Sequence, residues 1–300
     1  MDKIISNIIY GFLWLLSKLP FKVLYFISDI IYLFIYYIIG YRKSIVRRNL
    51  KSFFPEKTDF ELKNIEKKFY KHFVDIFIEM IKSFSISIDE LNKRFKIINA
   101  EVINKLYDND KSVILNSCHY GNWEWVIGMG QHIEHYPVAI YSRIKNKFLD
   151  SKIKQNRSRF GIELVLKHHI SKVMYSHAKA DQLYAYGFLS DQSPKIGRAY
   201  YWSSFLGARV PVFTGAEYFA KKHDLAMVYV SIKKVKRGFY TCDYELLTEN
   251  PNEFKDFELT ELYLKKVEAQ IKEEPAYYLW THNRLKKVGK EHLKPEVSSW

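Results

Sequence analysis

The chain has 300 residues, 48% of them apolar, with 47 Lys and Arg against 33 Asp and Glu, a net charge of +14. This length and composition support one large domain or two small ones and exclude an intrinsically disordered protein. The positive charge favours acidic partners, while Cys118 and Cys242 lie too far apart in the sequence to predict a disulfide framework or a zinc site.

Two apolar stretches open the chain and predict a membrane anchor over residues 1–40. Residues 4–19 end at Pro20, and residues 23–40 contain a single charge, Asp29. The second stretch is close to the roughly 20 residues that cross a hydrocarbon core. An aspartate near the centre of a spanning helix costs about 2.5–3.5 kcal/mol, so a hairpin that enters one leaflet fits as well as a full span. Two buried helices of a soluble protein are the third alternative.

A cationic segment follows the apolar stretches directly, where a secretory signal would have a small-residue cleavage site. Its cations are Arg42, Lys43, Arg47, Arg48 and Lys51. By the positive-inside rule such a segment stays in the cytoplasm. The rest of the chain is therefore expected on the cytoplasmic side of a membrane.

Residues 41–300 are predicted to form an α/β domain with a helical lead-in that ends at residue 94. Apolar residues at three- and four-residue spacing predict a long amphipathic helix over 59–87. Beyond the lead-in, short β-branched or aromatic runs alternate with segments long enough for helices, which indicates a mostly parallel sheet flanked by helices. The expected strands are 95–100, 112–117, 137–141, 183–190, 209–213 and 226–232, and the expected helices are 146–160, 169–180, 214–222 and 257–273.

The segment richest in chemistry is NSCHYGNWEW, residues 116–125, directly after a predicted strand. Open α/β sheets bind ligands at strand ends. Within one helix, His119 and Glu124 would lie about 140° apart. They converge if His119 lies in the turn and Gly121 supplies its corner. Asn122 then caps a helix whose first turn holds Glu124.

In this arrangement Glu124 fixes the tautomer of His119 and raises its basicity, so that His119 can take a proton from an attacking hydroxyl. The alternative reading of the spacing is a histidine satisfied by local hydrogen bonds beside a glutamate that caps a helix. Cys118 precedes His119, but neighbours in a strand point to opposite faces, which argues against an acyl-cysteine mechanism.

The ordered motifs resemble the late lipid A acyltransferases, the lauroyl and myristoyl transferases of the glycerolipid acyltransferase superfamily. His119-Tyr-Gly-Asn-Trp-Glu124 is similar to the His-x4-Glu signature of that superfamily. The flanking segments that agree are Gly40-Tyr41-Arg42, Asn49-Leu50, Phe54-Pro55-Glu56, Tyr141-Ser142-Arg143 with Lys145-Asn146, Arg157-Ser158-Arg159-Phe160-Gly161, Ser190-Asp191-Gln192-Ser193-Pro194, Thr214-Gly215 and Trp280-Thr281-His282-Asn283-Arg284. The resemblance covers residues 10–287. Tyr141-Ser142-Arg143 departs from the usual Tyr-Arg-Pro, so no role carries over to Arg143.

The resemblance implies transfer of a fatty acyl chain from an acyl carrier protein thioester to a hydroxyl of a lipid A precursor, at the cytoplasmic face of the inner membrane. It assigns catalysis to His119 and Glu124. The candidate substrate-binding or oxyanion residues are Arg157, Arg159, Asp191, Gln192 and Asn122. Guanidinium groups suit an oxyanion or a substrate phosphate, although a solvated helix face also explains both arginines. A plain turn likewise explains Asp191 and Gln192.

A thioester is already activated, so the reaction requires no metal or cofactor, and none is expected. The sequence contains no GxGxxG or P-loop pattern, and His132-Ile-Glu-His135 and His168-His169 lack a third ligand at useful spacing. The expected partners are the donor, the acceptor and an anionic membrane, without nucleic acid. Two alternatives remain: an acyltransferase for another polar lipid, such as a glycolipid or aminolipid, and a non-catalytic membrane-tethered module that binds acidic partners.

Overall fold

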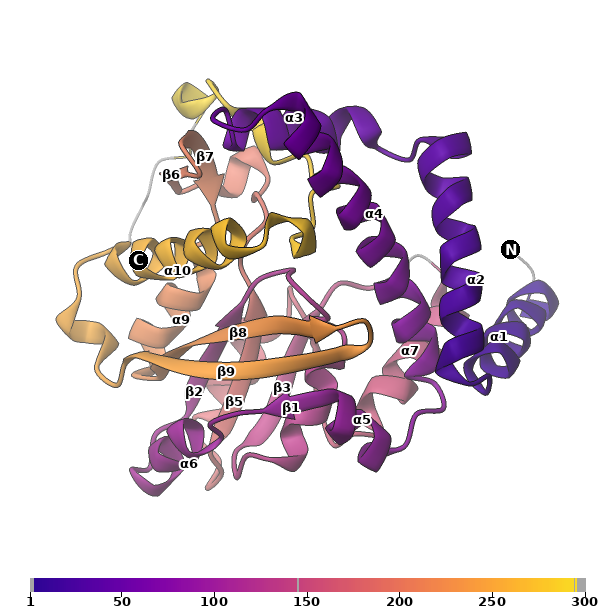
Figure 1. The fold of residues 1–300 in the computed structure, drawn as a ribbon. Helices are drawn as coiled ribbons and strands as arrows, with labels where there is room; N and C mark the ends of the chain where they lie inside the picture. Colours follow the sequence, from indigo (N-terminus) through magenta and orange to yellow (C-terminus); the bar gives the residue numbers. More distant parts are fainter. Residues whose placement is uncertain (1–2, 145, 294, 296–300) are drawn as a thin grey trace.

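The computed structural model describes residues 3–144, 146–293 and 295, arranged around one central sheet (Figure 1). Lys145 of the motif series and the end of the basic tail lie outside the described residues. The helices are α1 (Lys3–Ser17), α2 (Phe21–Leu33) continued by the π-helix η1 (Phe34–Ile39), α3 (Lys43–Phe53), α4 (Asp59–Lys82), α5 (Ile88–Arg94), α6 (Glu101–Asp108), α7 (Lys147–Ser158), α8 (Ile170–His177), α9 (Gly215–His223) and α10 (Glu258–Glu273). Six 3₁₀ turns supplement them: η2 (Trp125–Gln131), η3 (Ile196–Arg198), η4 (Pro251–Glu253), η5 (Pro275–Tyr277), η6 (Arg284–Lys287) and η7 (Glu291–Leu293).

The central sheet has seven strands in the order β1-β9-β8-β2-β5-β3-β4. Its strands are β1 (Phe95–Ile97), β2 (Val113–Ser117), β3 (Tyr136–Tyr141), β4 (Glu163–Leu166), β5 (Tyr184–Leu189), β8 (Ala226–Lys236) and β9 (Phe239–Thr248). All neighbouring strands are parallel except β8 and β9, which form an antiparallel hairpin. The predicted α/β fold, a mostly parallel sheet flanked by helices, is confirmed. The four-residue β4 was not expected, because a run this short carries little periodicity.

Helices cover both faces of the sheet, and the central strand shows how the sequence specifies this. All of β2 is buried, as expected for a parallel strand between two helical layers. Val113 and Leu115 pack in one apolar cluster with α5, α6 and η2, whereas Ile114 packs in another with α8 and α9. Successive side chains of a strand point to opposite faces, so three adjacent apolar residues serve two cores.

The predicted strand over 209–213 forms, but not in the central sheet. It is β7 (Ala208–Val212), which pairs antiparallel with β6 (Tyr201–Phe205) in a separate two-stranded sheet. Leu206 and Gly207 join them, both with positive φ. Two such residues make the tight turn whose twist matches a hairpin, so the segment pairs locally.

The two N-terminal apolar segments fold as α1 and α2, and both contact α4, while α1 also contacts α7 (Figure 1). Among the described residues, one helix is long and apolar enough to cross a membrane, Phe21–Ile39, and 17% of its apolar 18-residue stretch is buried inside the protein. Exposed apolar side chains cover much of this surface: Ile8, Phe12, Leu15, Phe26, Leu33, Phe34, Ile38 and Ile39. This surface fits association with a membrane.

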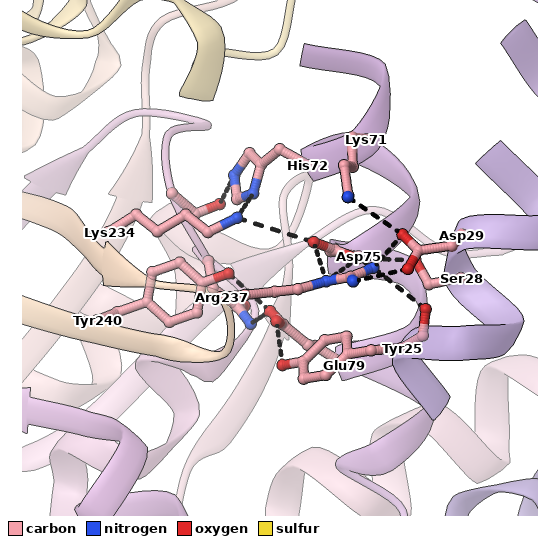
Figure 2. Close-up of polar contacts among 12 residues, drawn as sticks. Tyr25, Ser28, Asp29, Lys71, His72, Asp75, Glu79, Lys234, Arg237 and Tyr240 are labelled. Carbon is pink, nitrogen blue, oxygen red and sulfur yellow. Dashed lines mark hydrogen bonds and ion pairs between the residues drawn. The ribbon is translucent and has the colours of Figure 1, made fainter. Parts of the chain in front are cut away.

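The polar side of α2 docks on the domain through Arg237, at the tip of the β8–β9 hairpin (Figure 2). Its guanidinium contacts Asp75 of α4 at 2.7 Å and Asp29 of α2 at 2.8 Å. Ser28 also donates to Asp75, at 2.7 Å. The single charge of the second apolar stretch is therefore paired by the domain, and α2 is held along one side.

Candidate active site

The site is built at the carboxyl edge of the sheet, where β2 and β5 run parallel and end together. Ser117 of β2 is in register with Leu189 of β5. His119 and Asp191 each lie two residues beyond those positions. Because the two strands are parallel and in register, His119 and Asp191 lie side by side at the strand ends. This edge is where open α/β sheets bind their ligands.

His119 and Asp191 form the central contact. Nδ1 of the ring is 2.7 Å from Oδ1 of Asp191, whose side chain is 1% exposed. Burial acts to lower the pKa of His119, but the charge and hydrogen bond of Asp191, with a smaller contribution from Glu124, outweigh it and raise that pKa. Burial alone would raise the pKa of Asp191, yet His119 and Arg284 lower it. The carboxylate therefore stays ionised and fixes the ring with Nδ1–H as donor.

The other ring nitrogen of His119 faces Gln192. The Gln192 amide donates to Nε2 across 3.3 Å. Because Nδ1 carries the proton, Nε2 presents its lone pair, which is the form a general base needs. Trp123 lies edge-on to the ring, with the ring centroids 5.4 Å apart.

Side chains of α4 hold the loop that carries His119. Gly121 has φ +58°, and its carbonyl accepts from Nε2 of His72 at 3.2 Å. Asn122 accepts from the backbone N–H groups of Glu124 and Trp125 through Oδ1 and donates to Glu79 at 2.6 Å. The predicted corner at Gly121 is present, and Asn122 binds the N–H groups expected of a cap. The helix that follows is the 3₁₀ helix η2, which begins at Trp125, so Glu124 precedes it instead of lying in the first turn of an α-helix.

Glu124 does not hold His119, which corrects the contact predicted from the sequence. Its carboxylate pairs instead with Arg157 of α7, at 2.6 Å. The reason is that Asn122 turns the chain into η2, so Glu124 faces α7 while Asp191 reaches the ring from β5. Glu124 acts on His119 through its charge.

The two candidate arginines have different surroundings. Arg157 lies at the site through its pair with Glu124. Arg159 donates to the carbonyl of Ile86 and lies over the ring of Phe160, so it does not reach His119. Positions two apart near a helix end point about 200° apart around the axis, which separates the two guanidinium groups.

An apolar pocket opens beside this loop, between η2 and the face of the sheet. Glu124, Arg157 and Ser117 supply its few polar groups. Its apolar lining is Leu115, Trp123, Val126, Ile127, Met129, Pro137, Val138, Ala139, Ile140, Tyr141, Ile162, Leu164, Ala185, Gly187, Phe188, Leu189 and Val230. Since Trp123 and Glu124 belong to both the pocket and the His119 loop, a chain in this pocket would begin next to the imidazole.

Cys118, which precedes His119, does not fit the role of a nucleophile in this site. Cys118 is buried, burial raises the pKa of its thiol well above the ordinary value, and the thiol faces Gln270. A thiol that resists ionisation is a poor nucleophile. Within the described residues, no three His, Cys, Asp or Glu side chains gather as a metal site would require.

Two supports of the loop, His72 and Glu79, were missed by sequence reasoning, although a signal existed. Both lie on the buried side of α4, where the helical pattern expects apolar residues. A polar side chain on the core face of an amphipathic helix needs a buried partner, and that partner is commonly functional.

A histidine oriented by a buried carboxylate, beside an apolar pocket at the carboxyl edge of a sheet, is the arrangement expected of a transferase for a hydrophobic substrate. The match to known families agrees. Residues 2–287 match the family of bacterial lipid A biosynthesis acyltransferases, and the chain belongs to this family. It is an acyltransferase of lipid A biosynthesis, with an acyl donor and a lipid acceptor. No curated protein shows significant similarity to the chain.

Proposed function

We propose that this protein transfers a fatty acyl chain from an acyl carrier protein thioester to a hydroxyl of a lipid A precursor, as a late acyltransferase at the cytoplasmic face of the inner membrane. The observation that carries the proposal is the 2.7 Å contact between His119 and Asp191 beside the apolar pocket. Family membership supplies the reaction class. This geometry favours catalysis over the alternative of a non-catalytic binding module.

In the proposed reaction, Nε2 of His119 takes the proton of the acceptor hydroxyl while the oxygen bonds to the thioester carbonyl carbon. The C–S bond then breaks, and the imidazolium returns the proton to the departing thiolate, which leaves an ester and a free thiol. Asp191 stabilises the imidazolium through its 2.7 Å contact. Gln192, which donates to Nε2 in the structure, turns aside to admit the hydroxyl.

Arg157 is the proposed donor to the oxyanion. One of its N–H groups is bonded to Glu124, which orients the guanidinium at the mouth of the apolar pocket and leaves further N–H groups for the substrate. Glu124 is therefore proposed to act on the reaction by fixing Arg157 and by adding negative charge near His119. The acyl chain of the donor would occupy the apolar pocket.

We further propose that α1 and α2 lie in one leaflet as a monotopic anchor. The pairs that Asp29 makes with Arg237 and Lys71 hold α2 against the domain along one side. A helix that crossed the bilayer would have to break these pairs and bury an aspartate in hydrocarbon. Washing membranes with high-pH carbonate and then with detergent measures how tightly the anchor is held.

The test of function uses the purified full-length protein with acyl carrier protein thioesters of several chain lengths and a lipid A precursor, and mass spectrometry of the lipid product. The wild type should add one acyl chain. His119→Ala should keep its fold and lose the transfer, while the exposed His168→Ala serves as the matched control.

Appreciable turnover by His119→Ala would remove the proposed mechanism. Transfer to another polar lipid, with the lipid A precursor left unchanged, would replace the proposed acceptor. Equal transfer rates with acyl-coenzyme A as the donor would contradict the proposal that acyl carrier protein is the donor.

A further inference from the structure

A second cavity, of about 480 Å³, lies between the segment after Gln192 and the C-terminal segment around His282, and it is strongly cationic. Its lining is Arg42, Ser193, Lys195, Ile196, His282, Asn283, Lys286, Lys287 and Lys290. In the part of the chain that the structure describes, no carboxylate lines it, and none of its five Lys and Arg side chains takes part in an ion pair. This gathering of cations is not neutralised by the protein around it. We call it the cationic cavity.

Two of the cations are fixed by backbone groups and three remain available. Arg42 donates to the carbonyl of Thr281 at 3.0 Å, and Lys287 donates to the carbonyl of Pro194. These bonds tie the walls together. Lys195, Lys286 and Lys290 are exposed at the rim, with ammonium groups free to turn toward a ligand.

The residues behind the cavity add further positive charge, and the negative charge that acts on His282 and Arg284 is that of Asp191, on the side of His119. Burial lowers the pKa of His282 to about 4, and the charges of Arg284 and Lys287 push it in the same direction. Burial also lowers the pKa of Lys287, with Lys286 and Arg284 adding to the shift. Arg284 is 2% exposed, and its Nε and Nη2 atoms are buried without a hydrogen-bond partner. An anion in the cavity would relieve this repulsion.

The cationic cavity shares a wall with the candidate site. Ser193 follows Gln192, which contacts Nε2 of His119. The segment that leads to His282 runs beside the His119 loop, because the N–H of Leu279 donates to the carbonyl of His119 at 3.0 Å. The apolar pocket therefore adjoins the His119 loop at Trp123, and the cationic cavity adjoins the segment that follows Gln192.

The cavity also begins where the apolar surface of the anchor ends. Arg42 comes three residues after Ile39, the last residue of η1, and its turn leads into α3 beside the C-terminal segment (Figure 1). An amphiphile with its chains at the level of α2 would meet this cavity with its headgroup. A volume of about 480 Å³ suits a sugar headgroup with charged substituents.

We infer that the cationic cavity binds the headgroup of the acceptor through at least two anionic groups, phosphates or carboxylates, and so places the acceptor hydroxyl at His119. This inference rests on the proposed function for the identity of the acceptor. Lysines that contact a concave wall suit compact phosphate groups. The long acidic helix of a carrier protein would instead need an extended convex or flat surface.

The first experiment measures binding alone and does not depend on catalysis. The full-length protein in detergent is titrated with inorganic pyrophosphate by calorimetry, in the wild type and in the triple variant Lys195→Gln, Lys286→Gln, Lys290→Gln. The control variant Lys93→Gln, Lys96→Gln, Lys105→Gln removes the same charge from exposed positions on α5, β1 and α6, far from α3 and the C-terminal segment (Figure 1).

The wild type and the control should bind pyrophosphate, and the triple variant should bind it at least about tenfold more weakly, since each charged hydrogen bond is worth roughly 1.5–3 kcal/mol and tenfold is about 1.4 kcal/mol. Equal binding in all three proteins would mean that no anion site exists at this cavity. Retained binding in the triple variant with normal folding overturns the inference.

The second experiment distinguishes the acceptor from other sources of anionic groups. Steady-state transfer is measured with a phosphorylated acceptor and with the same lipid after dephosphorylation. In the triple variant the KM for the phosphorylated acceptor should rise about tenfold or more, the KM for the donor should stay unchanged, and the preference for the phosphorylated lipid should disappear.

Each other outcome decides a different point. A rise in the KM for the donor alone would assign the cavity to the carrier protein and refute the inference. If the protein binds pyrophosphate but acylates the phosphorylated and dephosphorylated acceptors equally well, the cavity is a site for free phosphate only, and the inference is refuted. If no acceptor is acylated but pyrophosphate binding is lost in the triple variant, the proposed function fails while the anion site stands.

Discussion

Replacement of Asp191 by Asn tests which carboxylate orients His119. The structure places Asp191, 1% exposed, 2.7 Å from Nδ1, so its charge is hardly screened by solvent. In a buried His–Asp pair the Asn substitution keeps the shape but favours the wrong tautomer, at a cost of about 10⁴ in turnover. Because Glu124 adds a second negative charge near the ring, we expect a loss of about 10³–10⁴, or roughly 4–5.5 kcal/mol of transition-state stabilisation.

The pH profile separates this role from a loss of folding. The proposed mechanism requires neutral His119, whose pKa is raised in the folded protein, so wild-type activity should fall as the pH drops through a value above the ordinary 6.5. Without Asp191 burial would dominate, and this acid limb should move to lower pH. Asp181→Asn, exposed at the other end of β5, should leave rate and profile unchanged. Glu124→Gln should lower turnover through Arg157 but move the limb little.

Two outcomes would refute this reasoning. The first is an Asp191→Asn enzyme that keeps a tenth or more of its wild-type rate. The second is an acid limb that moves with Glu124→Gln but not with Asp191→Asn, which would return the orienting role to Glu124. Both variants should be shown by circular dichroism to fold as the wild type does before the rates are compared.

Three further substitutions have defined outcomes. Arg237→Gln leaves the buried Asp75, 1% exposed, without its main partner and should lower the free energy of unfolding, measured with denaturant, by about 3–5 kcal/mol. Asp29→Asn changes a side chain that is 43% exposed and should lower it by less than about 1 kcal/mol. Equal effects of the two substitutions would contradict the network in Figure 2. Gly121→Ala places a Cβ 2.9 Å from Ile232 at φ +58° and should lower both the melting temperature and the rate, while Gly215→Ala, with open space around it, should change neither. Met129→Trp narrows the apolar pocket at the end of η2 away from Glu124 and should shift donor preference toward shorter chains in a competition assay; an unchanged preference would exclude the pocket as the acyl site.

Much of the fold follows from local patterns. Strands such as β2 and helices such as α9 are bounded by their own periodicity and turn residues, so their positions agree with the expectation to within a few residues. The strand β7 was assigned to the central sheet, and its partner β6 was not predicted, because periodicity does not identify pairing partners. Periodicity marks a strand but does not choose its neighbour.

The site shows the same division. Gly121 and Asn122 were predictable because a positive φ and a helix cap are decided within a few residues. The pairing of His119 with Asp191, 72 residues apart, depends on the register between β2 and β5. Glu124 lies five residues from His119 and was therefore the natural candidate, yet the turn at Asn122 sends it to Arg157.

Helix α4 connects α2 to the candidate catalytic loop, and this bears on where the protein can be divided. Asp75 holds Arg237 and Ser28, while one turn further Glu79 accepts from Tyr25 of α2 at 2.7 Å and from Asn122 of the loop at 2.6 Å. Removing α2 would expose the apolar face of α4 and take a donor from the carboxylate that holds Asn122. The change in composition at residue 40 therefore does not coincide with a boundary in packing, and α2 belongs to the structure that positions His119.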